Sequence, residues 1–142
     1  LMSIQAVKGV EIGDGFEVVG RLGSQAHDPI RWDAEHQRYT RLSSLAGGLE
    51  GGMTNGELVV ARAAMKPLAT LNRPTLETVD TATKESAVSF KERTDVTAVP
   101  AMGVVAETMV ALVLAQEAQR KFGGDNVAEF VRNVEAFQRT LP

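Results

Sequence analysis

Residues 47–56 read Gly-Gly-Leu-Glu-Gly-Gly-Met-Thr-Asn-Gly, and strand-like segments stand on both sides of this run. Half of its residues are glycine, which loses more conformational freedom on folding than any other residue. A fold keeps such a run where the backbone takes positive φ or approaches another group closely. Two interpretations stay open here. The run is either a glycine-rich hairpin connection or a loop whose N–H groups hold a phosphate or a flat ring.

The segments around the glycine run have the composition and alternation of strands. Asn55-Gly56 favours a two-residue hairpin turn of type I′. Pro67 has no N–H for a strand ladder, so the strand after the run should end near Lys66. We expect a short helix over 16–22 and a polar loop over 24–38. The strand-like segments are 8–12, 38–45, 58–65, 75–80 and 84–90.

The apolar segment from Val99 to Phe122 predicts a long helix. Pro100 fits the first turn of a helix, where its missing N–H costs nothing. Glu107 is the only charged residue between 96 and 116, so the helix is apolar on nearly all sides. We expect it to be buried between layers rather than to span a membrane, since a glutamate at mid-helix is costly in lipid. Asp125 should cap a second helix with one apolar face, made of Val127, Phe130, Val131, Val134, Phe137 and Leu141.

Length and composition indicate one globular α+β domain, with an antiparallel sheet packed on the long buried helix. The chain has 142 residues, of which 44% are hydrophobic and 23% are charged. Its net charge of −3 comes without a basic stripe, which argues against a nucleic-acid partner. The absence of cysteine excludes disulfides and thiolate metal sites. No secretory signal opens the chain, and residues 1–7 read as the tail of an apolar helix whose beginning is missing.

Several polar residues are candidates for chemistry or binding. Lys66, with Thr70 four residues later, is either a cation for an anionic ligand or a solvated strand-end lysine. Asp95 precedes the long helix, so it is a helix cap, a salt-bridge partner or a functional carboxylate. His27 and His36 lie in a polar segment, and their spacing matches no metal-binding pattern, so we predict no metal site.

Four segments together resemble the C-terminal portion of chorismate synthase: residues 4–16, 46–56, 63–67 and 93–101. The resemblance implies a helix layer between two antiparallel sheets, with residues 1–142 as the C-terminal part of a single domain whose N-terminal part is missing. It also implies the activity of a lyase. That enzyme converts 5-enolpyruvylshikimate 3-phosphate into chorismate and phosphate by a 1,4-elimination that needs reduced flavin mononucleotide (FMN). The family further implies a cytoplasmic homotetramer and an association with NADP.

The resemblance also assigns roles to individual residues. It implies that Asp95 of the Arg-x-Asp motif lies beside the flavin and the substrate and takes part in proton transfer. The implied flavin contacts are Gln5, Ala6, Gly51, Lys66, Pro67, Leu68, Ala69, Thr70 and Arg93.

The chain departs from the family pattern at several points. Ser44 stands where many members have asparagine, and Thr97 stands where relatives often have cysteine. Neither His27 nor His36 matches the motifs of the two catalytic histidines, so we expect this chain alone to be inactive. The alternative is a noncatalytic remnant that binds phosphate or flavin or associates with itself. An unrelated phosphate-binding module built on the glycine run is a third possibility.

Overall fold

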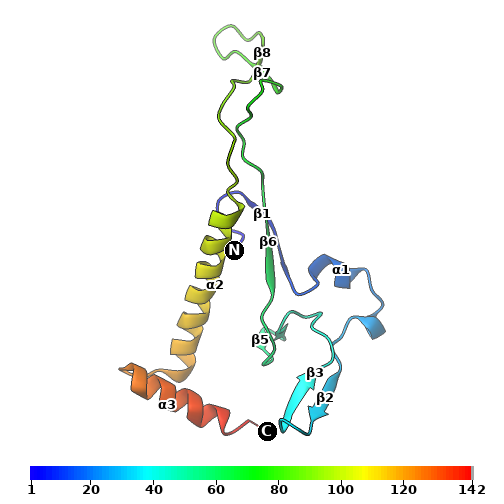
Figure 1. Cartoon of the computed structure of the whole chain (residues 1–142), viewed down its shortest axis with the longest axis vertical. Coiled ribbons are helices and arrows are strands. Elements are labelled where there is room, and N and C mark those ends of the chain that lie inside the picture. Colours follow the sequence, from blue (N-terminus) through cyan, green and yellow to red (C-terminus); the bar gives the residue numbers. More distant parts are fainter. Residues whose placement is uncertain (142) are drawn as a thin grey trace.

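The computed structural model describes residues 1–141 and has the α+β composition that the sequence predicts (Figure 1). Its strands pair only in antiparallel twos: β1 with β6, β2 with β3, β4 with β5, and β7 with β8. The predicted antiparallel sheet structure is present as four separate two-stranded ladders. In order, the elements are β1 (Val7–Ile12), α1 (Gly15–Val19), a 3₁₀ turn (Gly23–Gln25), β2 (Ile30–Asp33), β3 (Arg38–Arg41), β4 (Leu49–Glu50), β5 (Met53–Thr54), β6 (Ala61–Met65), β7 (Glu77–Val79), β8 (Ser86–Val88), α2 (Val99–Phe122) and α3 (Val127–Gln138).

The β1–β6 ladder forms the spine of the molecule. Val7 pairs with Met65 at one end and Ile12 with Ala61 at the other, with a register shift between Val7 and Gly9. Beyond this ladder the N–H of Lys66 donates to the carbonyl of Ala6 at 2.7 Å. Pairing then stops before the proline, as the sequence predicts, because Pro67 has no N–H to donate.

The glycine run forms a hairpin, with β4 and β5 joined by Gly51 and Gly52. Both turn residues have positive φ, +57° and +77°, as a type I′ turn requires. The prediction of a turn at Asn55-Gly56 is therefore wrong by position. The Asn55 side chain serves another purpose, because its amide nitrogen donates to Glu50 at 2.9 Å and its oxygen accepts the N–H of Glu57 at 3.0 Å.

The first glycines of the run allow three backbone segments to meet. The N–H of Gly13 donates to the carbonyl of Val60 at 2.9 Å, and the N–H of Val60 donates to the carbonyl of Gly47 at 3.0 Å. A Cβ on Gly47 would collide with the backbone of Gly13, and one on Gly48 would collide with the carbonyl of Leu58. Close backbone packing therefore explains these two glycines without a ligand.

The long helix α2 spans the predicted residues, but the expectation that it is buried is wrong within this chain. None of its residues is buried, and its apolar side chains Val104, Leu112 and Val113 are all more than half exposed. Among the helices and strands, α3 and β6 are its main neighbours, and its side chains stay largely exposed within residues 1–141. By length and composition alone it is also long and apolar enough to cross a bilayer.

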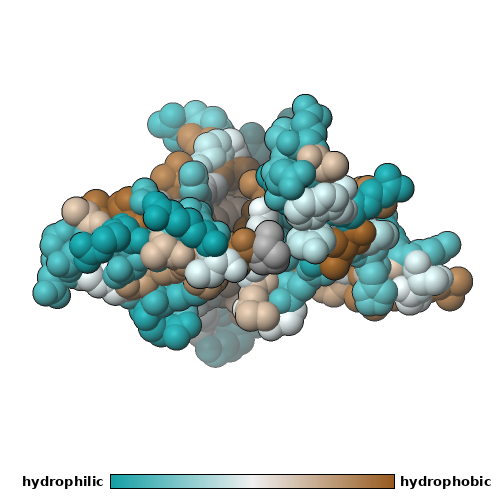
Figure 2. All heavy atoms as spheres, turned by 90° about the horizontal axis from the view of Figure 1, so that it is seen from below, coloured by the Kyte–Doolittle hydropathy of each residue, from teal (hydrophilic) through white to brown (hydrophobic). Residues whose placement is uncertain are grey.

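The chain as a whole buries little surface. Its exposed area is 11320 Å². A compact protein of 15.2 kDa exposes about 7,100 Å². Val7 is the only buried hydrophobic residue described, and apolar residues interrupt the polar surface on the face shown in Figure 2. Large apolar areas of this kind mark surfaces that another part of a protein covers.

Segment 24–38 contains a strand that the sequence reasoning missed. β2 pairs with β3, and Trp32 packs edge-to-face on Tyr39 with ring centroids 5.0 Å apart. The Asp33 carboxylate accepts the N–H groups of Glu35 and His36 and so closes the turn between the strands. Polar composition hid this strand, because its stabilisation comes from the cross-strand pair and the turn.

The remaining elements follow the predictions closely. The strands predicted over 75–80 and 84–90 appear as β7 and β8, which form an arm that projects beyond the first turn of α2 (Figure 1). The short helix predicted over 16–22 appears as α1. The cap of α3 is one residue later than predicted, because the side chain of Asn126, not Asp125, accepts the N–H of Glu129.

Candidate functional site

A cleft of about 360 Å³ lies between the end of β6 and the start of α2. One wall is the segment that follows β6, and the other is the segment that leads into α2. The β7–β8 arm leaves from the first wall and returns to the second, so it brings two motifs far apart in sequence into one place (Figure 1). The lining residues are Met65, Lys66, Pro67, Leu68, Thr70 and Leu71 on one side and Thr94, Val96, Thr97, Ala98 and Val99 on the other.

Hydrogen bonds between the walls hold the cleft together at the base of the arm. The N–H of Glu92 donates to the carbonyl of Leu71 at 2.8 Å. The hydroxyl of Thr70 donates to the carbonyl of Arg93 at 3.4 Å. Thr70 therefore both lines the cleft and ties its two walls together.

Lys66 provides the positive charge of the cleft. Among residues 1–141, no carboxylate lies within ion-pair distance of its ammonium. Thr70, Thr94 and Thr97 line the same cleft, while Met65 and Val96 add apolar surface. An unpaired ammonium with hydroxyl donors and an apolar wall suits a ligand that has both an anionic group and a flat ring.

The structure places Ala6, which follows Gln5, beside this cleft but places Gly51 elsewhere. Ala6 has a φ of +66°, and its carbonyl accepts the N–H of Lys66 at 2.7 Å. Gly51 lies in the β4–β5 hairpin, near the Ala61 end of β6 and away from the Lys66 end (Figure 1). Of the predicted site residues, Lys66, Pro67, Leu68 and Thr70 line the cleft itself.

Arg93 and Asp95 form an ion pair next to the cleft. Nε of Arg93 donates to Oδ1 of Asp95 at 2.5 Å, and Nη2 donates to Oδ2 at 2.9 Å. These hydrogen bonds from Arg93 lower the pKa of Asp95 below its ordinary value, and the same contact raises the pKa of Arg93. The N-cap of α2 is Ala98, so Asp95 forms the predicted salt bridge and not the predicted cap.

Thr94, Val96 and Thr97 line the cleft, although sequence reasoning did not select them as contacts. Thr94 lies between Arg93 and Asp95 in the motif that the sequence did indicate, and Val96 and Thr97 follow Asp95. Their position within the motif, or between it and the helix, is the one signal that could have identified them.

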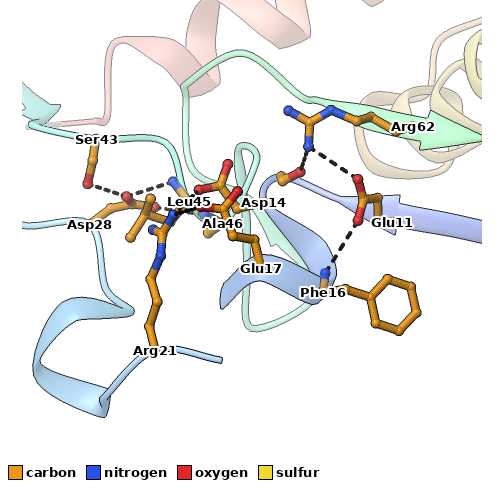
Figure 3. Close-up of polar contacts among 11 residues, drawn as sticks. Glu11, Asp14, Phe16, Glu17, Arg21, Asp28, Ser43, Leu45, Ala46 and Arg62 are labelled. Carbon is orange, nitrogen blue, oxygen red and sulfur yellow. Dashed lines mark hydrogen bonds and ion pairs between the residues drawn. The ribbon is translucent and has the colours of Figure 1, made fainter. Parts of the chain in front are cut away.

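A second polar cluster, centred on Asp28, holds the segment that leads into the glycine run (Figure 3). Asp28 is only 7% exposed, and its carboxylate accepts three hydrogen bonds, from the Ser43 hydroxyl at 2.5 Å and from the N–H groups of Leu45 at 2.8 Å and Ala46 at 2.9 Å. Burial alone would raise the pKa of Asp28, but these bonds outweigh it and the pKa is lowered. Sequence reasoning missed this residue, because a single aspartate in a polar loop carries no pattern.

Ion pairs next to Asp28 connect α1 and β6 to the same region. Arg21 donates to Asp14 at 3.0 Å and to Glu17 at 2.7 Å. Arg62 donates to the carbonyl of Gly13 and faces the carboxylate of Glu11 (Figure 3). In this way the segments before and after the glycine run are held by side chains, and the hairpin that contains Gly51 projects from a fixed base.

No group of three metal-ligating side chains occurs among the described residues. His36 instead pairs with Asp33, with 2.8 Å between Nδ1 and Oδ2.

Comparison with known proteins gives a consistent result. A family model described as chorismate synthase matches residues 1–118. The chorismate synthase of Corynebacterium jeikeium (strain K411) is 61% identical over 137 residues, which are 96% of this chain and 32% of that protein. The chorismate synthase of Mycobacterium tuberculosis (strain ATCC 25177 / H37Ra) is 56% identical over 141 residues, covering 99% of this chain and 34% of that protein.

A solved structure agrees with the sequence comparison. The crystal structure of a chorismate synthase matches with a TM-score of 0.77 and 42% identity, covering 99% of this chain and 34% of that one. The chain therefore spans about a third of the length of the relatives that it matches.

Proposed function

The chain belongs to the chorismate synthase family, and we propose that it forms one third of a lyase that converts 5-enolpyruvylshikimate 3-phosphate into chorismate and phosphate. In this 1,4-elimination a C–O bond to phosphate breaks and a proton leaves carbon, without net oxidation or reduction. The whole-length enzyme, meaning this chain joined to the other two thirds of a chorismate synthase, is the form in which we expect activity.

We propose reduced FMN as the cofactor of this enzyme. The observation that carries this proposal is Lys66, which has no ion-pair partner among residues 1–141, in a cleft lined by three threonines and an apolar wall. FMN has a phosphate group and a flat ring, so the donors and the wall fit its two parts. When bound, the reduced flavin supplies an electron-rich ring, and its oxidation state is the same before and after the elimination.

The proposed flavin contacts divide into three groups by position. Lys66, Pro67, Leu68, Ala69 and Thr70 form or adjoin the wall after β6, and Lys66 offsets negative charge. Ala6 adjoins that wall through the hydrogen bond from Lys66, and Gln5 is its neighbour in the chain. Gly51 has open space where a Cβ would lie, so its backbone is accessible to a ring that the folded enzyme brings to it.

Asp95 is the residue of this chain that we propose for proton transfer. Arg93 holds its carboxylate by one hydrogen bond to each oxygen, and each oxygen keeps a lone pair that can accept a proton. Arg93 has further N–H groups available for the flavin or the substrate. The remaining proposals are a cytoplasmic homotetramer and an association with NADP. Association is supported by the exposed apolar side chains of α2.

Product formation by the whole-length enzyme tests this proposal. With reduced FMN, we expect chorismate and phosphate to appear in equal amounts. Asp95→Asn should lower kcat roughly 10²-fold, because Asn is close in shape but cannot accept the proton. Asp125→Asn is the matched control, since the Asp125 side chain has no hydrogen-bond partner among residues 1–141. Absence of product would contradict the proposed activity, and near-normal turnover of Asp95→Asn would contradict the role of Asp95.

A further inference from the structure

Arg93 and Asp95 are joined by two nearly parallel hydrogen bonds rather than one. Nε donates to Oδ1 and Nη2 donates to Oδ2, at 2.5 and 2.9 Å. Guanidinium and carboxylate groups are both planar, so a two-pronged contact fixes the orientation of the carboxylate as well as its distance. Among residues 1–141, the Asp95 carboxylate otherwise accepts only its own backbone N–H, and no second charged side chain lies within ion-pair distance of it.

The backbone of Arg93 is anchored on the opposite wall of the cleft. Its carbonyl accepts the Thr70 hydroxyl at 3.4 Å, and the preceding N–H, from Glu92, donates to Leu71 at 2.8 Å. Thr94, the residue between Arg93 and Asp95, lines the cleft. The Arg93 side chain thus extends from an anchored backbone, and among residues 1–141 its guanidinium is the side-chain group that contacts the Asp95 carboxylate.

The ion pair does not use all the donors of Arg93. A guanidinium has five N–H groups, so two bonds to Asp95 leave about three for a ligand. Arg93 can therefore bind flavin and orient Asp95 at the same time. Separate measurements of the flavin Kd and of kcat distinguish the two roles.

We propose that Arg93 is a positioning residue for Asp95. Its two-pronged ion pair sets the orientation of the carboxylate beside the cleft, and loss of the guanidinium lowers turnover through Asp95 rather than through loss of flavin. This inference rests on the proposed proton transfer by Asp95.

A double-mutant cycle in the whole-length enzyme tests the proposal, using Arg93→Gln, Asp95→Asn and the double variant. At saturating reduced FMN, we expect Arg93→Gln to lower kcat at least about tenfold, a loss that weaker flavin binding alone cannot cause. The double variant should be no slower than Asp95→Asn by more than about threefold, since Arg93 then has no carboxylate to orient. Arg73→Gln is the control, because it removes an arginine of the same arm that forms no ion pair among residues 1–141.

Arg93→Lys separates charge from geometry. Lysine keeps the positive charge but lacks the planar fork, so we expect kcat to stay several-fold below wild type. Full activity of Arg93→Lys would overturn the orientation role.

The possible outcomes separate this inference from the function on which it rests. Normal turnover of Asp95→Asn would overturn the proton-transfer role and this inference together. Losses that multiply in the double variant, or a tenfold rise in flavin Kd with unchanged kcat in Arg93→Gln, would overturn this inference alone. A measurement without turnover adds an independent test: NMR titration of the Asp95 carboxyl carbon should give a higher pKa in Arg93→Gln than in wild type. An unchanged titration would contradict the contact.

Discussion

Asp28→Ala should lower the free energy of unfolding by about 3 kcal/mol, the largest effect that we expect from one side chain of the glycine-run region. The carboxylate is 7% exposed and accepts three hydrogen bonds, from Ser43, Leu45 and Ala46. Each hydrogen bond to a charged group contributes about 1.5–3 kcal/mol, and the desolvation of the carboxylate offsets part of the sum. Truncation leaves three donors unpaired, although water can enter the space and recover part of the loss.

Asp28→Asn should cost about half as much as Asp28→Ala. Both Ser43 and Leu45 donate to Oδ1, which the amide oxygen of asparagine can replace. Ala46 donates to Oδ2, and there an amide nitrogen would face the N–H of Ala46, donor against donor. Ser43→Ala removes one hydrogen bond to the charged carboxylate and should cost about 1.5–3 kcal/mol.

Urea unfolding and amide hydrogen exchange of the whole-length enzyme measure this effect. A loss of about 3 kcal/mol corresponds to an increase in local opening at the Ala46 amide of roughly a hundredfold. Asp125→Ala serves as the control, because it removes an aspartate whose carboxylate accepts no hydrogen bond among residues 1–141. A change below about 0.5 kcal/mol for Asp28→Ala, with unaltered exchange at Ala46, would refute the structural role of Asp28.

The same carboxylate should make stability depend on pH. The folded state lowers the pKa of Asp28, so its contribution is complete above the ordinary Asp value of about 3.9 and is lost as the pH falls through the lower folded pKa. The difference in stability between wild type and Asp28→Asn should therefore be largest near neutral pH and shrink below about pH 4. An equal difference at pH 7 and at pH 3 would contradict this assignment.

Two further predictions concern backbone packing and association. Gly47→Ala should destabilise the whole-length enzyme by at least about 2 kcal/mol more than Gly52→Ala, because both glycines have positive φ but only the Cβ at position 47 would meet the backbone of Gly13; equal losses of unfolding free energy would contradict the close approach. The 142-residue chain alone should associate in sedimentation velocity experiments through the exposed apolar side chains of α2, and Leu112→Glu should reduce the association; a compact monomer at high concentration would count against it.

The strands of the spine and the long helix could be predicted from local patterns. Three local features decide these elements: the alternation in 8–12, the missing N–H of Pro67 and the apolar run after Pro100. The structure has β1, β6 and α2 at those places. The burial of α2 could not be predicted in this way. Burial depends on which surfaces lie against the helix, and residues 1–141 place mainly β6 and α3 there.

The candidate site could be predicted only in part, because it too depends on which segments the fold brings together. The resemblance to chorismate synthase directed attention to Lys66, Arg93 and Asp95, and the fold brings their two segments to one cleft. The threonines of the second wall and the Asp28 cluster depend on contacts between distant segments, 15 residues apart for Ser43 and Asp28. The position of the hairpin turn was also not predictable from the local pattern. The Asn55 side chain bonds to Glu50 and Glu57, and the turn forms at Gly51 and Gly52 instead.

Flavin titration of the whole-length enzyme with Lys66→Ala tests the central proposal most directly. If the cleft between the end of β6 and the start of α2 holds the flavin, loss of its unpaired ammonium should raise the FMN Kd at least about tenfold, since a charged hydrogen bond contributes about 1.5–3 kcal/mol. Lys91→Ala removes a lysine that is near in sequence to the second wall but does not line the cleft, and it should leave the Kd unchanged. An unchanged Kd in Lys66→Ala would contradict the proposal and make Lys66 a solvated lysine at the end of a strand.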